Sequence, residues 1–201
     1  MKRSYTIVIS SLFAVSALSG CSGFTMYPAD VYTVAAQPYR AFTEEEVHSS
    51  ECRIEFTDEV SVNGQGAWFS GNDIIISEGG IYIITGTYGS GCISITTADP
   101  VKLIFDNANI TNPSGCAVHS SAQRLVISSE NGSSSLTGCG EDFDNAVYSA
   151  GDLLFVGTGE LSVDGGVYSV GGIQFGRGTS VLCEILRAQG GYVIPGSLYV
   201  N

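Results

Sequence analysis

An acidic stretch in the second half of the chain, Glu141-Asp142-Phe143-Asp144-Asn145, carries the side chains that bind hard metal ions. Calcium takes about six to eight oxygen ligands, and closely spaced carboxylates on a turn can provide several of them. Asp106 and the asparagines that follow it offer further oxygens. Neither stretch has the ligand spacing of an EF-hand loop, and an acidic loop that is merely solvated has the same composition. The candidate calcium ligands are Asp142, Asp144, Asn145 and Asp106.

A ring occupies the same position in three segments of similar form: Ala117-Val-His-Ser120, Ala146-Val-Tyr-Ser149 and Gly166-Val-Tyr-Ser169. If the valines face the interior, strand alternation turns His119, Tyr148 and Tyr168 outward, between small residues. Exposed rings with small neighbours would form a flat strip of the kind on which sugar rings stack. Stacked rings also stabilise adjacent strands without any ligand. A carbohydrate-binding surface and a purely structural ladder are both open at this stage.

Groups that could catalyse a reaction are sparse, and we expect no enzyme. A polysaccharide lyase would need a base beside a cation that acidifies the proton to be removed. Lys102 is the only lysine besides Lys2, and alternation predicts that it points outward into solvent. A hydrolase would need two facing carboxylates, and nothing marks such a pair. Neither His48 nor His119 lies in a serine or cysteine nucleophile pattern.

Repeated segments must position these residues. A serine, a small residue, a two-residue turn and an apolar-x-apolar strand recur in residues 121–127, 149–155 and 169–175. The first apolar positions of successive segments are separated by 20 to 28 residues: Val101, Leu125, Leu153, Ile173 and Leu198. A repeat of this length without helical periodicity indicates stacked units that cannot bury their faces alone. We predict an all-β fold, a right-handed parallel β-helix (β-solenoid) with short coils, over residues 73–201.

Alternation within the repeats predicts which side chains fill the solenoid. The expected inward columns are Val101/Leu103/Phe105, Leu125/Ile127, Leu153/Phe155 and Ile173/Phe175. A third strand in each coil is suggested by residues 161–163 and 182–185. Residues 51–72 are expected to form an edge strand or cap over the first coil, because an open sheet edge needs cover. The single tryptophan, Trp68, is assigned to the core of that cap in preference to a sugar platform.

The N-terminus reads as an export signal. Residues 1–20 combine Lys2 and Arg3 with an apolar stretch too short to span a bilayer. They end in Leu18-Ser19-Gly20-Cys21, which resembles a bacterial lipobox and implies lipidation of Cys21. Residues 21–50 would then be a lipidated terminus and flexible tether. We expect a membrane-anchored lipoprotein of the cell envelope, at the outer membrane or cell surface.

Charge and cysteine content set further limits. The formal net charge is −12 at pH 7, and it becomes more negative once Lys2 and Arg3 are removed. With no basic cluster, the chain is not expected to bind nucleic acid. Export permits disulfides, and Cys92 and Cys116 each follow a glycine and open neighbouring coils. A bridge between them and two unpaired buried thiols are both open.

Three segments carry a resemblance to a known family: residues 76–86, 101–112 and 145–163. They resemble coils of secreted bacterial carbohydrate-binding domains related to a clostridial cellulose- and pectin-binding β-helix. The resemblance implies a fold like that of polysaccharide lyases, without catalysis, and binding of plant-wall polysaccharide with calcium. A structural or adhesive surface protein is the main alternative, and a calcium-dependent polysaccharide lyase is a third.

Overall fold

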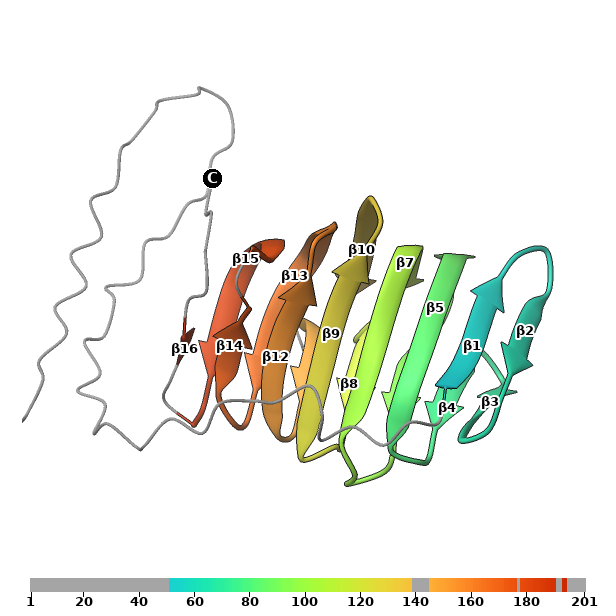
Figure 1. Ribbon diagram of the computed structural model, residues 1–201, viewed down its shortest axis with the longest axis horizontal. Helices are drawn as coiled ribbons and strands as arrows, with labels where there is room; N and C mark the ends of the chain where they lie inside the picture. Colours follow the sequence, from blue (N-terminus) through green and yellow to red (C-terminus); the bar gives the residue numbers. More distant parts are fainter. Residues whose placement is uncertain (1–50, 139–144, 177, 191–192, 195–201) are drawn as a thin grey trace, which may run out of the picture. The chain divides into compact units, whose positions relative to one another are not determined.

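The computed structural model of the protein describes residues 51–138, 145–176, 178–190 and 193–194 (Figure 1). The regular secondary structure within these ranges consists of β-strands alone. The described residues therefore include no helix long and apolar enough to cross a bilayer. The strands are β1 (Glu51–Phe56), β2 (Val60–Asn63), β3 (Ala67–Ser70), β4 (Asp73–Ile76), β5 (Gly80–Tyr88), β6 (Ile93–Ile95), β7 (Val101–Asn112), β8 (Val118–Ser120), β9 (Arg124–Glu130), β10 (Ser133–Gly138), β11 (Asn145–Ser149), β12 (Asp152–Gly157), β13 (Glu160–Ser169), β14 (Ile173–Phe175), β15 (Ser180–Ala188) and β16 (Val193–Ile194).

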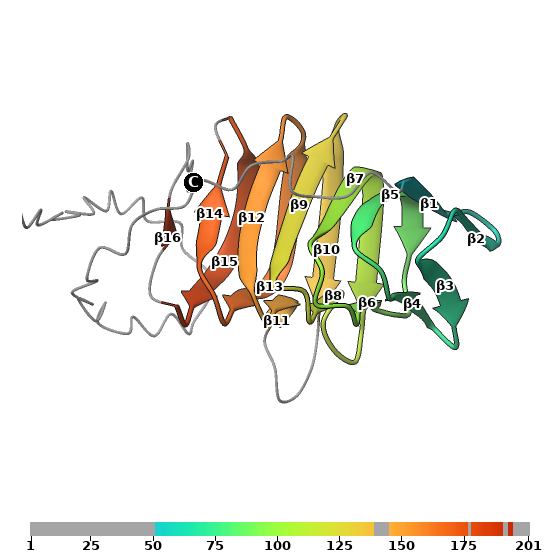
Figure 2. The same ribbon diagram turned by 60° about the horizontal axis from the view of Figure 1, so that its bottom comes forward.

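The chain winds through three faces, each a parallel sheet of equivalent strands from successive coils. Face A holds β4, β6, β8, β11 and the second halves of β13 and β15. Face B holds β1, the first halves of β5 and β7, then β9, β12, β14 and β16. Face C holds the second halves of β5 and β7, then β10 and the first halves of β13 and β15. Face B crosses Figure 1, and the short strands of face A line the lower edge of Figure 2. The predicted all-β parallel solenoid is confirmed.

Equivalent residues of successive coils stack into buried ladders. The first predicted column is in register and buried throughout: Val101, Leu125, Leu153 and Ile173. Two residues further along, Phe155 stacks on Phe175 with ring centroids 5.3 Å apart. Because each strand turns only alternate side chains inward, a single coil has no core of its own and is stabilised by its neighbours. The predicted inward columns are therefore confirmed, and the predicted third strands are parts of β13 and β15.

The corner between faces B and C requires a left-handed backbone. Gly86, Asn107 and Asn131 take φ values of 88°, 52° and 41° there, a region in which glycine is relaxed and asparagine is tolerated. At Gly86 the adjacent coil comes very close, because a Cβ atom on this residue would collide with the carbonyl oxygen of Phe56. Glycine at this corner thus allows both the turn and the stacking of β5 on β1.

The N-terminal strands extend the solenoid and also close its end. β1 pairs in parallel with β5, residue for residue, whereas β2 and β3 pair antiparallel with β1 and β4. The assignment of Trp68 to a buried cap core is wrong, because its side chain is 48% exposed. Trp68 lies opposite Ile75, which sits between the inward-facing Ile74 and Ile76, so both Trp68 and Ile75 point outward.

Replacing Gly86 with alanine tests the close approach at this corner. Gly86→Ala should lower the free energy of unfolding by more than about 2 kcal/mol, because the strained φ and the contact with Phe56 add together. Gly89→Ala is the matched control, since nothing lies within 4 Å of a Cβ at that position. Urea denaturation measures both variants. Equal stability of the two would contradict the close stacking of β5 on β1.

Candidate functional site

His119, Tyr148 and Tyr168 form a continuous row on the outside of face A, here called the ring row. The three residues are in register on β8, β11 and β13. The ring centroids of His119 and Tyr148 are 4.8 Å apart with an angle of 11° between the planes. Those of Tyr148 and Tyr168 are 5.7 Å apart at 10°. The structure thus confirms that these side chains point outward together.

The ring row is positioned by an apolar column on the other side of the same strands. Val118, Val147 and Val167 are in register and fully buried. Because each valine points inward and side chains alternate along a strand, the residue after each valine points outward. At the end of the row, the Tyr168 hydroxyl donates a hydrogen bond of 2.9 Å to Oε1 of Gln189. The rings are therefore held by the core beneath them and by a polar contact at one end.

The rings do not form the flat strip that the sequence suggested. Their spacing is close to the strand separation of about 4.8 Å, and their planes are nearly parallel. They therefore lie face to face, so that each ring covers a face of the next and the edges are left toward solvent. The outer edges carry the hydroxyl group of Tyr148, that of Tyr168, which also donates to Gln189, and the imidazole nitrogens of His119. These groups can hydrogen-bond to a hydroxylated ligand.

The small residues expected beside the rings are also placed differently. Ala117 and Ala146 are fully buried and pack in the hydrophobic core. Ala117 lies just before the first residue of β8, and the pairing of β11 with β13 shifts register between Asn145 and Val147. Simple alternation fails at this corner, so the alanines turn inward.

The row extends beyond the three rings in both directions. Ser94 on β6 is in register with His119, and Arg187 on β15 with Tyr168. Further along, Ile75 pairs with Ser94, and Trp68 pairs with Ile75. The exposed Trp68 thus belongs to the same outward row. It lies on β3, three strands away from β8, which is the first strand of the ring row. Only the antiparallel pairing of β3 with β4 places it there, and no repeat in the sequence signals that pairing.

Of the four candidate calcium ligands the structure describes two, Asn145 and Asp106, and these two lie at different corners of the solenoid. Asp142 and Asp144 lie outside the described residues. Asn145 is buried at the corner between faces C and A, and its Oδ1 has no hydrogen-bond partner. Asp106 lies at the corner between faces B and C, where its Oδ1 accepts a hydrogen bond from Asn107. The face C part of β7 separates the two corners by about five residues, or roughly 16 Å. Within the described ranges no three His, Cys, Asp or Glu side chains form a metal cluster.

The cysteine pair predicted as a possible disulfide consists of free thiols. β6 and β8 pair with Ile93 opposite Val118, so Cys92 is level with residue 117 and not with Cys116. The bridge was proposed from a register that is wrong by one residue. Burial is the main cause that raises the pKa of Cys92 to about 12, and the Asp73 carboxylate adds to it. The thiol of Cys92 is therefore protonated at neutral pH and a poor nucleophile.

Lys102 also differs from its prediction. It points away from the core as expected, but it is only 8% exposed. A lysine that is covered in this way does not present a base to a polysaccharide in solution.

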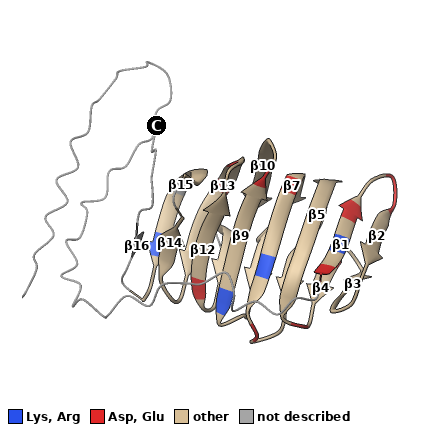
Figure 3. Ribbon diagram, in the orientation of Figure 1, with Lys and Arg blue, Asp and Glu red and all other residues tan. Residues whose placement is uncertain are grey.

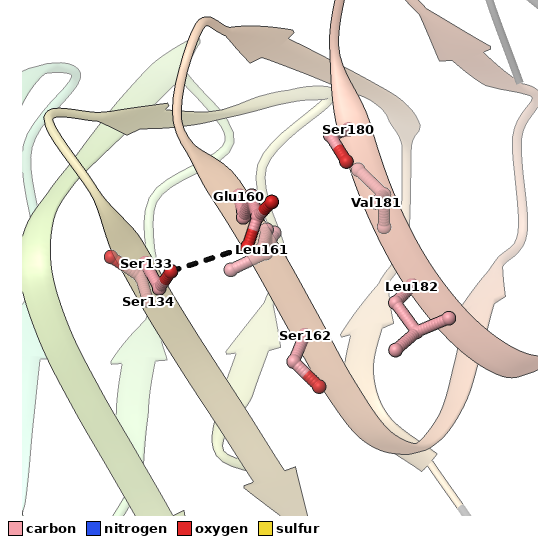
Figure 4. Close-up of a pocket in the computed structure, with 8 residues that line it drawn as sticks. All are labelled: Ser133, Ser134, Glu160, Leu161, Ser162, Ser180, Val181 and Leu182. Atoms are coloured by element: carbon pink, nitrogen blue, oxygen red, sulfur yellow. Dashed lines mark hydrogen bonds between the residues drawn. The ribbon is translucent and has the colours of Figure 1, made fainter. Parts of the chain in front are cut away.

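A shallow hollow of about 260 Å³ lies on face C (Figure 4). It is bordered by Ser133, Ser134, Glu160, Leu161, Ser162, Ser180, Val181 and Leu182. The Ser133 hydroxyl lies 3.3 Å from Oε2 of Glu160, to which it donates a hydrogen bond. The hollow offers small hydroxyl groups and one carboxylate, all of which can make hydrogen bonds to a ligand.

The fold and the ring row together define a class: a β-solenoid that displays a polar-edged ring at the same outer position of three successive coils. Residues 70–182, more than half of the chain, match the model of the family described as carbohydrate-binding domain-containing protein. The chain belongs to that family. All three rings of the ring row fall within the matched residues. No curated protein and no solved structure matches the chain.

Proposed function

We propose that this protein is a surface-tethered, non-catalytic receptor for polysaccharide, and that the ring row on face A contacts the glycan. The family match supports glycan binding. The observation that carries the choice of site is the in-register stack of His119, Tyr148 and Tyr168. The stack places one set of hydrogen-bonding groups on each of three neighbouring strands. A linear polysaccharide can lie along this row and contact all of them.

The stacked geometry determines how such a row would bind. Because the interior faces of the rings are occupied by one another, the phenol hydroxyls and the imidazole nitrogens make the contacts. The outer face of His119 is a further contact point, since its neighbour in the row is the small Ser94. A sugar ring placed over Ser94 would continue the stack. Plant-wall glycan remains the proposed ligand class.

A structural or adhesive surface protein is the second candidate. The same observation favours it, because rings that stack on each other already stabilise adjacent coils by about 0.5–1.5 kcal/mol per pair. Glycan pull-down distinguishes the two candidates. The lyase alternative receives no support from Lys102, which is covered, and an unsaturated-uronide absorbance assay tests it directly.

The proposal that the protein binds calcium is supported by one atom of the described structure, Oδ1 of Asn145. The buried Oδ1 of Asn145 has no hydrogen-bond partner, and leaving such an oxygen unsatisfied is costly. A bound cation would satisfy it, and Asp142 and Asp144 are close enough in sequence to add carboxylates. Asp106 is not in reach of this corner and is not included.

Removing the two hydroxyls of the ring row without removing its rings tests the binding edge. Tyr148→Phe/Tyr168→Phe should weaken glycan binding by roughly 30-fold, since each lost hydrogen bond contributes about 1 kcal/mol. Affinity is measured by depletion onto insoluble polysaccharide. Tyr88→Phe is the matched control, because its hydroxyl bonds to Asn72 outside the ring row. If only Tyr148→Ala/Tyr168→Ala lost binding, together with stability, the row would be a structural ladder.

Adding Ca²⁺ should raise the melting temperature, because an ion that binds only the folded state stabilises it by mass action. At about 100 times the dissociation constant the gain is about 2.7 kcal/mol. Asn145→Ala should abolish the shift, whereas Asn109→Ala on face C should retain it. Differential scanning calorimetry with and without chelator gives the result. An unchanged melting temperature at millimolar Ca²⁺ would remove calcium from the proposal.

The anchor proposal rests on Cys21, for which the lipobox resemblance is the support. Cys21→Ser should move the protein from the membrane fraction to the soluble fraction, because the lipid has no other attachment point. Cys139→Ser serves as the control and should stay in the membrane fraction. Immunoblotting of fractionated cells, with mass spectrometry of the N-terminal peptide, measures both. Continued membrane association of Cys21→Ser would contradict the anchor.

A further inference from the structure

The hollow on face C is bordered by two rows of outward side chains. Ser133, Glu160 and Ser180 are in register on β10, β13 and β15, and Ser162 and Leu182 are in register two residues further along. All of these side chains are exposed. The serines are short, whereas the side chains of Glu160 and Leu182 are long, so the surface sinks between them (Figure 4).

The hollow has a fixed shape, because it lies directly over the core. Leu161 and Val181 lie between the two rows, point to the interior and are at most 8% exposed. The middle strand, β13, is paired with β10 on one side and with β15 on the other. A site that exists before the ligand arrives loses less free energy to ordering than a flexible loop does.

The hydrogen-bonding groups of the hollow suit a ligand with several neighbouring hydroxyls. The Glu160 carboxylate accepts a hydrogen bond of 3.3 Å from the Ser133 hydroxyl. A carboxylate has about four acceptor sites, so Glu160 can also accept from two adjacent hydroxyl groups of a ligand. The hydroxyls of Ser162 and Ser180 can both donate and accept. Donors and acceptors for a polyhydroxylated molecule therefore lie together.

The charge of the hollow favours a neutral ligand. The described basic residues, blue in Figure 3, are Arg53, Lys102, Arg124 and Arg187, and none of them lines the hollow. The Glu160 carboxylate therefore repels an anion without any compensating cation nearby. One carboxylate is also too few for a metal site, since calcium takes about six to eight oxygen ligands.

The apolar side and the size of the hollow narrow the ligand further. Leu182, which is 57% exposed, offers an apolar surface beside the hydroxyl of Ser162. A sugar ring has the same division, with hydroxyls around its edge and C–H groups on its faces. The volume of about 260 Å³ lies below the roughly 300–1,000 Å³ of sites for drug-sized ligands. It therefore has room for about one sugar ring.

We propose that this hollow is a second glycan site, which binds one neutral sugar residue at a chain end or side branch of a polysaccharide. The inference rests on the proposed glycan binding, and the family match that supports such binding includes every residue of the hollow. The ring row lies on face A, so a polysaccharide extended along that row does not pass over the hollow on face C. A chain end or a branch needs only the width of one residue.

Titration of the full chain with methyl glucoside tests the hollow, because this probe is neutral and imitates a terminal sugar residue. The backbone amide resonances of residues 160–162 and 180–182 should shift most in nuclear magnetic resonance spectra. Glu160→Gln should weaken binding of the probe by about tenfold, since hydrogen bonds to a charged acceptor are stronger than those to a neutral one. Asp164→Asn, the same change of charge on the same strand but outside the hollow, should keep the wild-type affinity. Equal affinities of the two variants would overturn the proposal.

Three further comparisons use the same titration. Ser162→Leu should fill the hollow and abolish binding of methyl glucoside, with the β-sheet circular dichroism retained. Tyr148→Phe/Tyr168→Phe should leave the affinity for this probe unchanged, because the ring row is a separate site. Methyl glucuronide should bind more weakly than methyl glucoside, since its carboxylate would face that of Glu160. Stronger binding of the glucuronide would contradict the assignment to a neutral sugar.

The measurements separate a failure of the hollow from a failure of the proposed function. The wild-type protein could be retained on insoluble polysaccharide while methyl glucoside shifts only resonances of β8 and β11, or none. The hollow would then not be a sugar site, and the ring row would stand. A wild-type protein that is not retained on any polysaccharide would overturn the proposed function, and the assignment of the hollow with it.

Discussion

The structure depends on the registration of parallel strands from one coil to the next. A strand spacing of about 4.8 Å places equivalent residues directly over one another, so the side chains of an inward column must suit one another, and most of these columns are apolar. The column of Val118, Val147 and Val167 shows the rule in its strictest form. The same registration aligns the residues on the outer surface, so one outward ring in each of three successive coils forms a stacked row.

Much of this order is readable from the sequence. The inward columns follow from alternation of β-branched and aromatic residues, and the outward direction of Tyr148 and Tyr168 follows from the valines before them. The face-to-face arrangement of the rings does not follow, because alternation fixes the side of the sheet and not the side-chain torsion angles. The sequence therefore located the ring row but suggested the wrong kind of surface.

The other differences have equally local causes. Cys92 and Cys116 are one residue out of register because the number of residues between a glycine and the next strand varies from coil to coil. Trp68 joins face A through an antiparallel pair, which interrupts the repeat. Lys102 is buried although it points outward. The burial of an outward side chain depends on contacts with distant parts of the chain, so a short stretch of sequence does not predict it. The sequence repeat thus predicts which residues stack into inward and outward columns. The structure of the terminal strands and the cover over the outer surface depend on contacts between segments far apart in the chain.

The presence of one ring in each of three successive coils also has a consequence for how such a protein can diversify. Since each coil contacts only its neighbours, gene duplication of one coil would insert one more ring into the row and leave the others in place. The number of contacts offered to a long polymer would then grow in unit steps, and repeated weak contacts multiply into strong retention when they act together. The affinity for a long polymer could thus change in evolution through the number of coils, while the chemistry of each single contact stays the same.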